Sequence, residues 1–267
     1  MDYKLIAVDI DGTLLNDEGK ISENTIKAIR MGVKKGLIFT IATGRPIQGV
    51  ENINAMINLD LPFITYNGAM VVMGKTRKIL YEKCMSSVDA KNIISLGKKY
   101  GVNIMVWKNN CLFVEKINEW VERYIKISTV EPIEVENLID VAEGGVTKIL
   151  WYDYTEKISE YHRTVGTFLS GNVNYYTSQP FFLEFTDKQA SKAIAMEKLG
   201  EFYGIDRKEM IAVGDGFNDL PMIEYAGLGV AMGNAPDEVK NKADFITLSN
   251  NEDGVAHVIN KFVLSAP

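Results

Sequence analysis

Leu5-Ile6-Ala7-Val8-Asp9-Ile10-Asp11-Gly12-Thr13 predicts a buried strand that ends in a polar turn. The apolar run before Asp9 is typical of a strand buried on both faces of a parallel sheet, and two acids and a glycine follow where such a strand would surface. The acids stand two residues apart, so in extended backbone they point the same way, and Gly12 permits a tight turn beside them. Because open α/β sheets bind ligands at the carboxyl ends of their strands, the stretch predicts a site.

Two other interpretations of this stretch are weaker. One is a solvated surface turn, since Asp and Gly are common turn residues. The other is an EF-hand calcium loop, which requires glycine at the sixth position counted from Asp9, where Leu14 stands. A site therefore needs partner residues from elsewhere in the chain.

Composition bounds the class of protein. The chain has 267 residues, 46% of them hydrophobic, and can bury a sizeable core. Its net charge of −6 and pI near 5.2 give no overall attraction to nucleic acid or anionic lipid, so we expect a metal or a small anionic metabolite as partner. Two separated cysteines, no leader and no apolar run of about 18 residues favour the reducing cytoplasm and no membrane contact.

Helical and strand-like patterns alternate after the first strand. The sequence predicts a helix over 22–35 and apolar strands over 37–42 and 63–66. The strands run into Thr43-Gly44-Arg45-Pro46 and Asn67-Gly68, again polar and glycine-bearing. Strands separated by helices, each opening into polar residues, predict βαβ winding and a parallel sheet.

The pattern changes between residues 84 and 186, where hairpin-like strands indicate an inserted α+β domain. In this insertion the sequence predicts helices over 86–100, 118–128 and 155–169, and strands over 103–107, 111–115, 148–152, 172–177 and 181–185. Alternating helices and strands resume with a helix from Ser191 to Tyr203. The sequence then predicts strands at 211–213, 228–231 and 245–248. It also predicts a helix that ends at Ala226, one that starts at Pro236 and one that covers 254–262. We therefore predict a Rossmann-like, doubly wound parallel-sheet core of residues 1–83 and 187–267, with residues 84–186 as an α+β cap.

Polar residues recur at the expected strand ends and helix starts of this core. They are Asp9, Asp11, Thr43, Lys192, Asp215, Asn218 and Asp219. If the sheet gathers them, carboxylates about 4 Å apart repel by about 4 kcal/mol per pair at an effective dielectric near 20, so a cation must compensate. Hard oxygen ligands without clustered His or Cys indicate magnesium. His162 and His257 lie in predicted helices, where surface or packing roles explain them.

Phosphoryl transfer uses such a set of residues. A carboxylate at Asp9 can attack phosphorus and form an aspartyl-phosphate, while a metal at Asp215 and the charge of Lys192 neutralise the phosphoryl oxygens. Asp11 can protonate the leaving oxygen and then deprotonate the attacking water. The hydroxyl of Thr43 can donate a hydrogen bond to the phosphoryl group.

Four segments resemble the motifs of the haloacid dehalogenase-like (HAD) hydrolases, in order along almost the whole chain. They are Asp9-Ile10-Asp11-Gly12-Thr13, Ala42-Thr43-Gly44-Arg45-Pro46, Lys192 and Gly214-Asp215-Gly216-Phe217-Asn218-Asp219. The Thr-Gly-Arg-Pro form, Tyr66-Asn67-Gly68-Ala69 and the late insertion resemble the Cof-type, class IIB sugar-phosphatase branch. In one departure, Ala193 follows the lysine where the family often has glycine, and Lys188 competes for the lysine's role.

The resemblance implies a magnesium-dependent phosphatase with a mobile cap. In the family the side chains that match Asp9 and Asp215 and the backbone carbonyl that matches Asp11 bind the metal, and we add Asp219 to this predicted set. The substrate-binding residues that it implies are Gly44, Arg45, Asn67, Gly68 and Asn218. For Arg45 the alternative is a pair with a surface acid. Gly227-Leu228-Gly229 is no dinucleotide loop, because it follows a helix and enters a strand.

We therefore expect a phosphatase for small phosphomonoesters, most of all sugar phosphates, that works as a monomer or small homo-oligomer through phospho-Asp9. A phosphosugar mutase with the same nucleophile is one alternative. A receiver module that only stores phosphate on Asp is another, although Asp11 and the insertion disfavour it. Dehalogenation is disfavoured because a halide leaving group needs no proton from Asp11.

Overall fold

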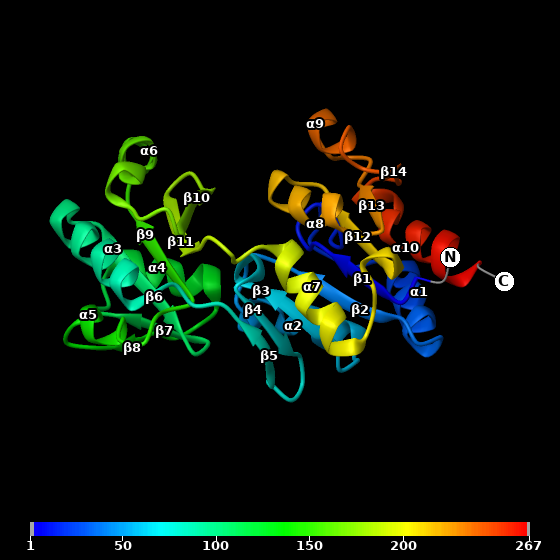
Figure 1. Cartoon of the computed structure of the whole chain (residues 1–267), viewed down its shortest axis with the longest axis horizontal. Coiled ribbons are helices and arrows are strands. Elements are labelled where there is room, and N and C mark those ends of the chain that lie inside the picture. Colours follow the sequence, from blue (N-terminus) through cyan, green and yellow to red (C-terminus); the bar gives the residue numbers. More distant parts are fainter. Residues whose placement is uncertain (1–2, 266–267) are drawn as a thin grey trace. The chain divides into compact units, whose positions relative to one another are not determined.

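The computed structural model of the protein describes residues 3–265 and divides them into two compact units. The core unit runs up to Tyr81 and resumes at Ser191, and the inserted unit is Glu82–Ala190. Both are shown in Figure 1. Their limits lie within a few residues of 83/84 and 186/187, the positions expected from the sequence; that the two units fold as independent domains stays a prediction.

One sheet forms the centre of the core unit (Figure 1) and, within the described residues, has eight strands. In order across the sheet they are β14 (Phe245–Ile246), β13 (Leu228–Ala231), β12 (Met210–Gly214), β1 (Leu5–Val8), β2 (Ile38–Ala42), β3 (Pro62–Thr65), β4 (Met70–Met73) and β5 (Ile79–Glu82). From β14 to β3 each neighbouring pair is parallel. The carboxyl ends of these strands therefore meet at one edge.

The central strand β1 is the apolar run that the sequence identified. All four of its residues are fully buried, and it pairs with β12 on one side and β2 on the other. Leu5 and Ala7 pack with Ala195 and Leu199 of α7 (Lys192–Tyr203) on one face. Because side chains alternate along a strand, the buried Ile6 points to the opposite face, so helices must cover both sides.

Helix ends in the core follow local capping chemistry. Ser22 accepts a hydrogen bond from the backbone of Thr25 at the start of α1 (Glu23–Lys34), and Ser191 accepts one from Ile194 at the start of α7. Gly204 ends α7 in the left-handed conformation that glycine adopts easily. The α-helices of the core unit are α1 (Glu23–Lys34), α2 (Glu51–Ile57), α7 (Lys192–Tyr203), α8 (Leu220–Tyr225), α9 (Asp237–Lys240) and α10 (Gly254–Ile259). Short 3-10 turns are η1 (Ile47–Val50), η2 (Tyr66–Gly68), η4 (Arg207–Glu209), η5 (Phe217–Asp219) and η6 (Asn250–Glu252), and η7 (Asn260–Leu264) is a π-helical turn.

The fold class predicted from the sequence is confirmed, with differences in detail in the core unit. Strands β4 and β5 were not expected, and β4 runs antiparallel to β3. Helix α2 was also missed, and β14 has two residues where four were predicted. Short elements next to a turn carry too little periodicity to be recognised, and tertiary pairing decides whether they form.

The inserted unit is built on a second sheet. Across it the strands are β10 (Val173–Gln179), β11 (Phe182–Asp187), β9 (Lys148–Tyr152), β6 (Asn103–Lys108), β7 (Cys111–Val114) and β8 (Ile133–Glu134). Its helices are α3 (Ser87–Tyr100), α4 (Glu119–Ser128), α5 (Leu138–Val141) and α6 (Thr155–Thr164), and η3 (Val165–Phe168) extends α6. The predicted hairpin is confirmed as the antiparallel pair β6–β7. Trp151 is buried with α3, α5 and α6, while Trp107 donates a hydrogen bond to Tyr124 of α4, so the unit is an α+β layer structure.

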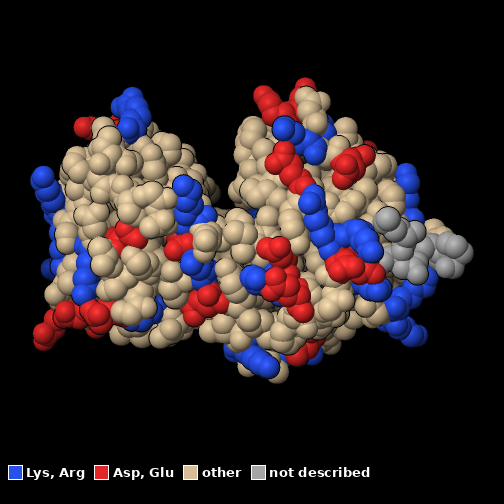
Figure 2. Space-filling model, in the orientation of Figure 1, with Lys and Arg blue, Asp and Glu red and all other residues tan. Residues whose placement is uncertain are grey.

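Two surface properties bear on partners. Among residues 3–265 no helix combines the length and apolarity that crossing a bilayer requires. On the face drawn in Figure 2, basic and acidic side chains are interspersed and separated by uncharged surface. This face offers no broad field of one sign.

Candidate active site

Three neighbouring strands deliver polar side chains to the same edge of the core sheet. Asp9 follows β1, Thr43 follows β2, and Asp215 follows β12. Because β1 lies between β12 and β2 and all three are parallel, their carboxyl ends are adjacent. The edge predicted from the first motif is therefore also the edge where the later motifs arrive.

Lys192 links the first and last motifs. Its Nζ donates to Oδ1 of Asp9 at 2.5 Å and to Oδ1 of Asp219 at 2.6 Å. The side chain is 1% exposed, and it stands at the first turn of α7, directly after the Ser191 cap. Lys188, the competing lysine of the sequence analysis, is exposed and belongs to the inserted unit. The structure therefore places Lys192, and not Lys188, in the acidic cluster.

Asp219 holds the loop after β12 in shape. Its Oδ2 accepts hydrogen bonds from the backbone N–H groups of Asp215 (3.1 Å) and Gly216 (2.9 Å), while Oδ1 faces Lys192. A Cβ at Gly214 would lie 2.4 Å from the Cβ of Asp219, so only glycine permits this close fold. Both oxygens of the buried Asp219 are therefore engaged by the protein.

Asp215 stands against the turn of the first motif. Thr13 donates a hydrogen bond from Oγ1 to Oδ1 of Asp215 at 2.7 Å. Gly12 has φ +80, and a Cβ there would lie 2.4 Å from Oδ2 of Asp215. Glycine is thus required at position 12 both for the turn and for the approach of this carboxylate.

Asp11 points to a different partner from Asp9. Its carboxylate accepts two hydrogen bonds from Arg45, from Nη2 at 2.6 Å and from Nε at 3.2 Å. Thr43, which is buried, accepts a hydrogen bond from the backbone N–H of Arg45 at 3.1 Å. The second motif therefore places the Thr43 hydroxyl at this edge of the sheet and, through Arg45, binds the second acid of the first motif.

The Asn67-Gly68 turn packs on the second and third motifs. The backbone N–H of Asn67 donates to the carbonyl of Thr43 at 2.9 Å, and a Cβ on Gly44 would lie 3.0 Å from Oδ1 of Asn67. Gly68 has φ +99, and a Cβ there would lie 2.1 Å from the carbonyl oxygen of Ser191. This turn therefore supports the start of the helix that carries Lys192.

The electrostatics of the cluster follow from burial and from the like charges. Burial raises the pKa of Asp9 to about 7 against the opposing effect of Lys192, and Asp219 and Asp215 raise it further. Burial disfavours the charge on Lys192, but Asp9 and Asp219 outweigh it and hold its pKa above the ordinary value. Burial also raises the pKa of Asp215, although the bond from Thr13 opposes the shift. The cluster has an excess of negative charge that one lysine does not neutralise.

This donor set fits a hard divalent cation. Asp9, Asp215 and Asp219 each offer a carboxylate oxygen, and these atoms lie within 4.8 Å of one another. The group contains oxygen donors alone, which suit Mg²⁺. The carboxylate of Asp11 lies with Arg45 and outside this group.

Three further residues bear on this site: Asn218, Thr13 and Asn234. Asn218 is exposed in η5, beside the cluster along the chain. The sequence pattern predicts no role for Thr13 or Asn234, although Nδ2 of Asn234 donates to the carbonyl of Gly12 at 2.8 Å. Asn234 follows β13, so the signal that could have found it is the same one: a polar residue just beyond a parallel strand.

A parallel sheet whose carboxyl edge gathers three carboxylates and a buried lysine defines a Rossmann-like enzyme of the phosphoryl-transfer class. The family model described as haloacid dehalogenase-like hydrolase matches residues 6–259. The chain belongs to the haloacid dehalogenase-like hydrolases, of the Cof type, as its motifs predicted.

Two relatives and one solved structure are similar to this chain over nearly its whole length. The chain is 34% identical to YxeH of Bacillus subtilis (strain 168) over 271 residues, which cover 98% of this chain and 99% of YxeH. It is 33% identical to 5-amino-6-(5-phospho-D-ribitylamino)uracil phosphatase YcsE of the same strain, covering 99% and 97% of the two chains. The solved structure of the HAD subclass IIB sugar phosphatase BT4131 superposes with a TM-score of 0.78 at 28% identity, covering 97% of this chain and 98% of that one. The protein is a phosphoric monoester hydrolase.

Proposed function

We propose that the protein is a magnesium-dependent phosphatase that hydrolyses small phosphomonoesters through a phosphoaspartate at Asp9. The observation that carries this proposal is the contact of Lys192 with both Asp9 and Asp219 in a buried cluster that includes Asp215. A buried carboxylate beside a fixed cation and a metal-binding acid is suited to nucleophilic attack on a phosphoryl group.

In the first step Asp9 attacks phosphorus and the ester oxygen leaves. Because Lys192 donates to Oδ1 of Asp9, we assign the attack to Oδ2. The P–O bond to the leaving alcohol breaks as the Asp9–phosphorus bond forms, and Asp11 gives its proton to the leaving oxygen. Two hydrogen bonds from Arg45 hold the ionised Asp11 carboxylate in one orientation, which suits the second step, in which Asp11 accepts a proton.

In the second step water attacks the phosphoaspartate. Asp11, now ionised, removes a proton from the water, whose oxygen bonds to phosphorus and releases Asp9 and inorganic phosphate. Thr43 accepts a hydrogen bond from the backbone of Arg45 and has its own proton to donate to a phosphoryl oxygen. Lys192 holds positive charge beside the reacting carboxylate throughout.

The metal would be held by the side chains of Asp9 and Asp215 and by the backbone carbonyl of Asp11. When bound, it would neutralise charge on the phosphoryl oxygens. Asp219 has both oxygens engaged by Lys192 and the backbone, so we place it as the residue that orients the lysine and the loop. The residues present thus suit Mg²⁺ and its usual mix of protein and water ligands.

We further propose a phosphorylated sugar or sugar alcohol as substrate, converted in the cytoplasm. Two similar proteins support this class: one is named for a phospho-ribityl substrate and the other is called a sugar phosphatase. The residues nearest the bound ester would be Gly44, Arg45, Asn67, Gly68 and Asn218.

A phosphatase screen tests the proposal. The purified protein is assayed with 4-nitrophenyl phosphate and a panel of sugar, sugar-alcohol and nucleotide phosphates, with Mg²⁺ or with EDTA. We expect Mg²⁺-dependent release of phosphate with many turnovers and a preference for the sugar and sugar-alcohol esters. A single equivalent of stable phosphoprotein would show a receiver instead, and an isomerised sugar phosphate without free phosphate would show a mutase.

A further inference from the structure

Only some backbone groups of the loop that carries the first motif form hydrogen bonds within the loop. The N–H groups of Thr13, Leu14 and Leu15 all donate to the carbonyl of Ile10. The carbonyls of Gly12 and Leu15 point outward and accept hydrogen bonds from side chains that stand more than 200 positions later in the chain. The exact path of this loop therefore depends on groups outside it.

Asn234 and Asn250 are those groups. Nδ2 of Asn234 donates to the Gly12 carbonyl at 2.8 Å, and Nδ2 of Asn250 donates to the Leu15 carbonyl at 3.1 Å. The two asparagines are themselves joined, because Oδ1 of Asn234 accepts the backbone N–H of Asn250 at 3.0 Å. They form one continuous brace, here called the asparagine brace, from the end of β13 to the turn η6.

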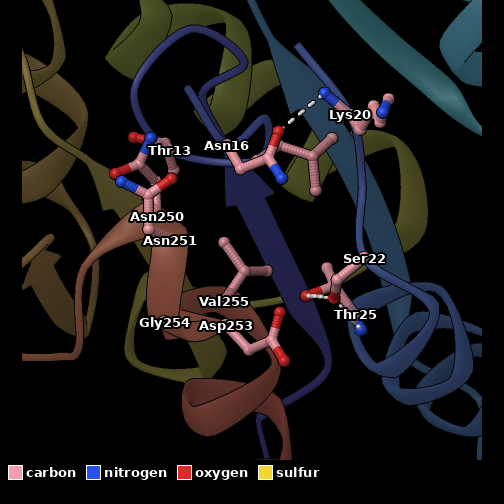
Figure 3. A pocket seen from close by; sticks show the side chains of 11 residues that line it. Thr13, Asn16, Lys20, Ser22, Thr25, Asn250, Asn251, Asp253, Gly254 and Val255 are labelled. Atoms are coloured by element: carbon pink, nitrogen blue, oxygen red, sulfur yellow. Dashed lines mark hydrogen bonds between the residues drawn. The ribbon is translucent and has the colours of Figure 1, made fainter. Parts of the chain in front are cut away.

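Further hydrogen bonds hold the far end of the asparagine brace. Oε2 of Glu252 accepts hydrogen bonds from the hydroxyl (2.6 Å) and the backbone N–H (3.2 Å) of Ser249 and so caps η6. Asn251 adds two bonds between its side chain and Asp17, the next part of the loop. In Figure 3, Asn250 and Asn251 extend from the C-terminal segment toward the loop that carries Thr13 and Asn16.

The space behind the loop explains why such bonds matter. A cavity of about 50 Å³ lies there, lined largely by polar side chains, among them Asn16, Ser22, Thr25 and Asn250 (Figure 3). A hollow of this size and polarity is large enough for water and offers the loop little close apolar packing. The position of the loop on this side therefore depends on the asparagine bonds.

We propose that Asn234 and Asn250 are positioning residues for catalysis and metal binding. Gly12 is the residue after Asp11, and Thr13 orients Asp215, so fixing the Gly12 and Leu15 carbonyls fixes the atoms on both sides of the cluster. This inference rests on the function proposed above. It adds two residues that touch neither phosphate nor metal and act through the backbone of the first motif.

The test compares Asn234→Ala and Asn250→Ala with the matched control Asn24→Ala. Asn24 also makes a long-range amide hydrogen bond, but its partner Asp253 lies outside the loop between Asp9 and Leu15. For each variant three quantities are measured: the Kd of Mg²⁺ by calorimetry, kcat and KM for 4-nitrophenyl phosphate, and the midpoint of thermal unfolding.

We expect each brace variant to raise the Mg²⁺ Kd and to lower kcat by about three- to tenfold, the effect of losing one or two hydrogen bonds. KM should stay within about twofold, because substrate contacts are unchanged. The unfolding midpoint should barely move, since water can replace the lost partners at the exposed Asn234 and the half-buried Asn250.

Brace variants with wild-type Kd and kcat at a temperature where they are fully folded overturn the inference, and so does an equal effect from Asn24→Ala. A lower unfolding midpoint without a change in Kd or kcat would reveal a merely structural role and has the same consequence. Failure of the proposed function gives a different result, because the wild-type protein itself would then show no Mg²⁺-dependent turnover.

Discussion

Arg45 holds Asp11 by two hydrogen bonds, from Nη2 at 2.6 Å and from Nε at 3.2 Å. The sequence left two roles open for this arginine, a phosphate clamp or a partner of a surface acid. The acid that it pairs with is the second acid of the first motif, so the contact itself bears on catalysis. With side chains 44% and 60% exposed, the pair contributes little to folding.

Arg45→Ala should therefore lower kcat by about 10- to 100-fold, because Asp11 loses its fixed orientation. KM would rise instead if clamping phosphate were the only role, so steady-state kinetics separate the two. Arg77→Ala is the matched control, since Arg77 makes a similarly exposed pair with Glu51. Unchanged kcat in Arg45→Ala would contradict the positioning role.

Asp9→Asn should abolish turnover of 4-nitrophenyl phosphate, by more than about 10³-fold, because the amide cannot form the phosphoaspartate. The folded state should not suffer. Folding raises the pKa of Asp9 to about 7, above its value in the unfolded chain. The contribution of Asp9 to the free energy of unfolding therefore decreases as the pH rises between these two pKa values, and the destabilisation is complete above pH 7. Urea unfolding should show Asp9→Asn gaining stability relative to wild type at pH 8 compared with pH 5, with exposed Asp237→Asn showing no such trend.

Lys192→Met should destabilise the metal-free protein by about 3–5 kcal/mol, the usual cost of leaving buried charges without their partner. The double variant Lys192→Met/Asp219→Asn should recover part of the loss, because one of the stranded carboxylates is removed. Urea unfolding in EDTA measures both, and Lys188→Met, at an exposed position, serves as the control. Equal stability of Lys192→Met and Lys188→Met would argue against the buried network.

Binding of Mg²⁺ should weaken as the pH falls through about 7. In the metal-free protein Asp9 takes up a proton near that pH, and the ion must displace it. Calorimetry in buffers of different ionisation enthalpy should detect release of about one proton per Mg²⁺ at pH 6 and much less at pH 8.5. Absence of proton release at pH 6 would show that Asp9 is already ionised there and would refute this account.

Gly68→Ala should cost more stability and activity than Gly204→Ala. Both glycines have positive φ, +99 and +67, but a Cβ at Gly68 would lie 2.1 Å from the Ser191 carbonyl, while a Cβ at Gly204 meets nothing within 4 Å. Gly204→Ala should therefore show only the conformational cost of about 1 kcal/mol. Gly68→Ala must also shift the start of α7, so both kcat and the free energy of unfolding should fall. Equal effects of the two variants in urea unfolding and kinetics would count against the close approach of Gly68 to the Ser191 carbonyl.

Local patterns in the sequence were sufficient for the fold class and for the motif residues. The buried run before Asp9, the serine caps of α1 and α7 and the polar residues after β1, β2 and β12 all depend on neighbours in the chain. Short elements such as β4 and α2 escaped prediction, because four to seven residues carry too little periodicity and tertiary packing decides whether they form.

Tertiary structure alone decided which side chains meet. Lys192 and Asp9 are 183 positions apart, and only the strand order and the direction of α7 bring Nζ to the carboxylate, whereas Lys188 is as plausible by residue type. The same holds for Arg45 with Asp11 and for Asn234 with Gly12. Local hydrophobic pattern and turn chemistry set which segments form strands and turns and which chemical groups stand at their ends, so these features can be read from the sequence. Which of those groups form pairs depends on how the chain packs in three dimensions.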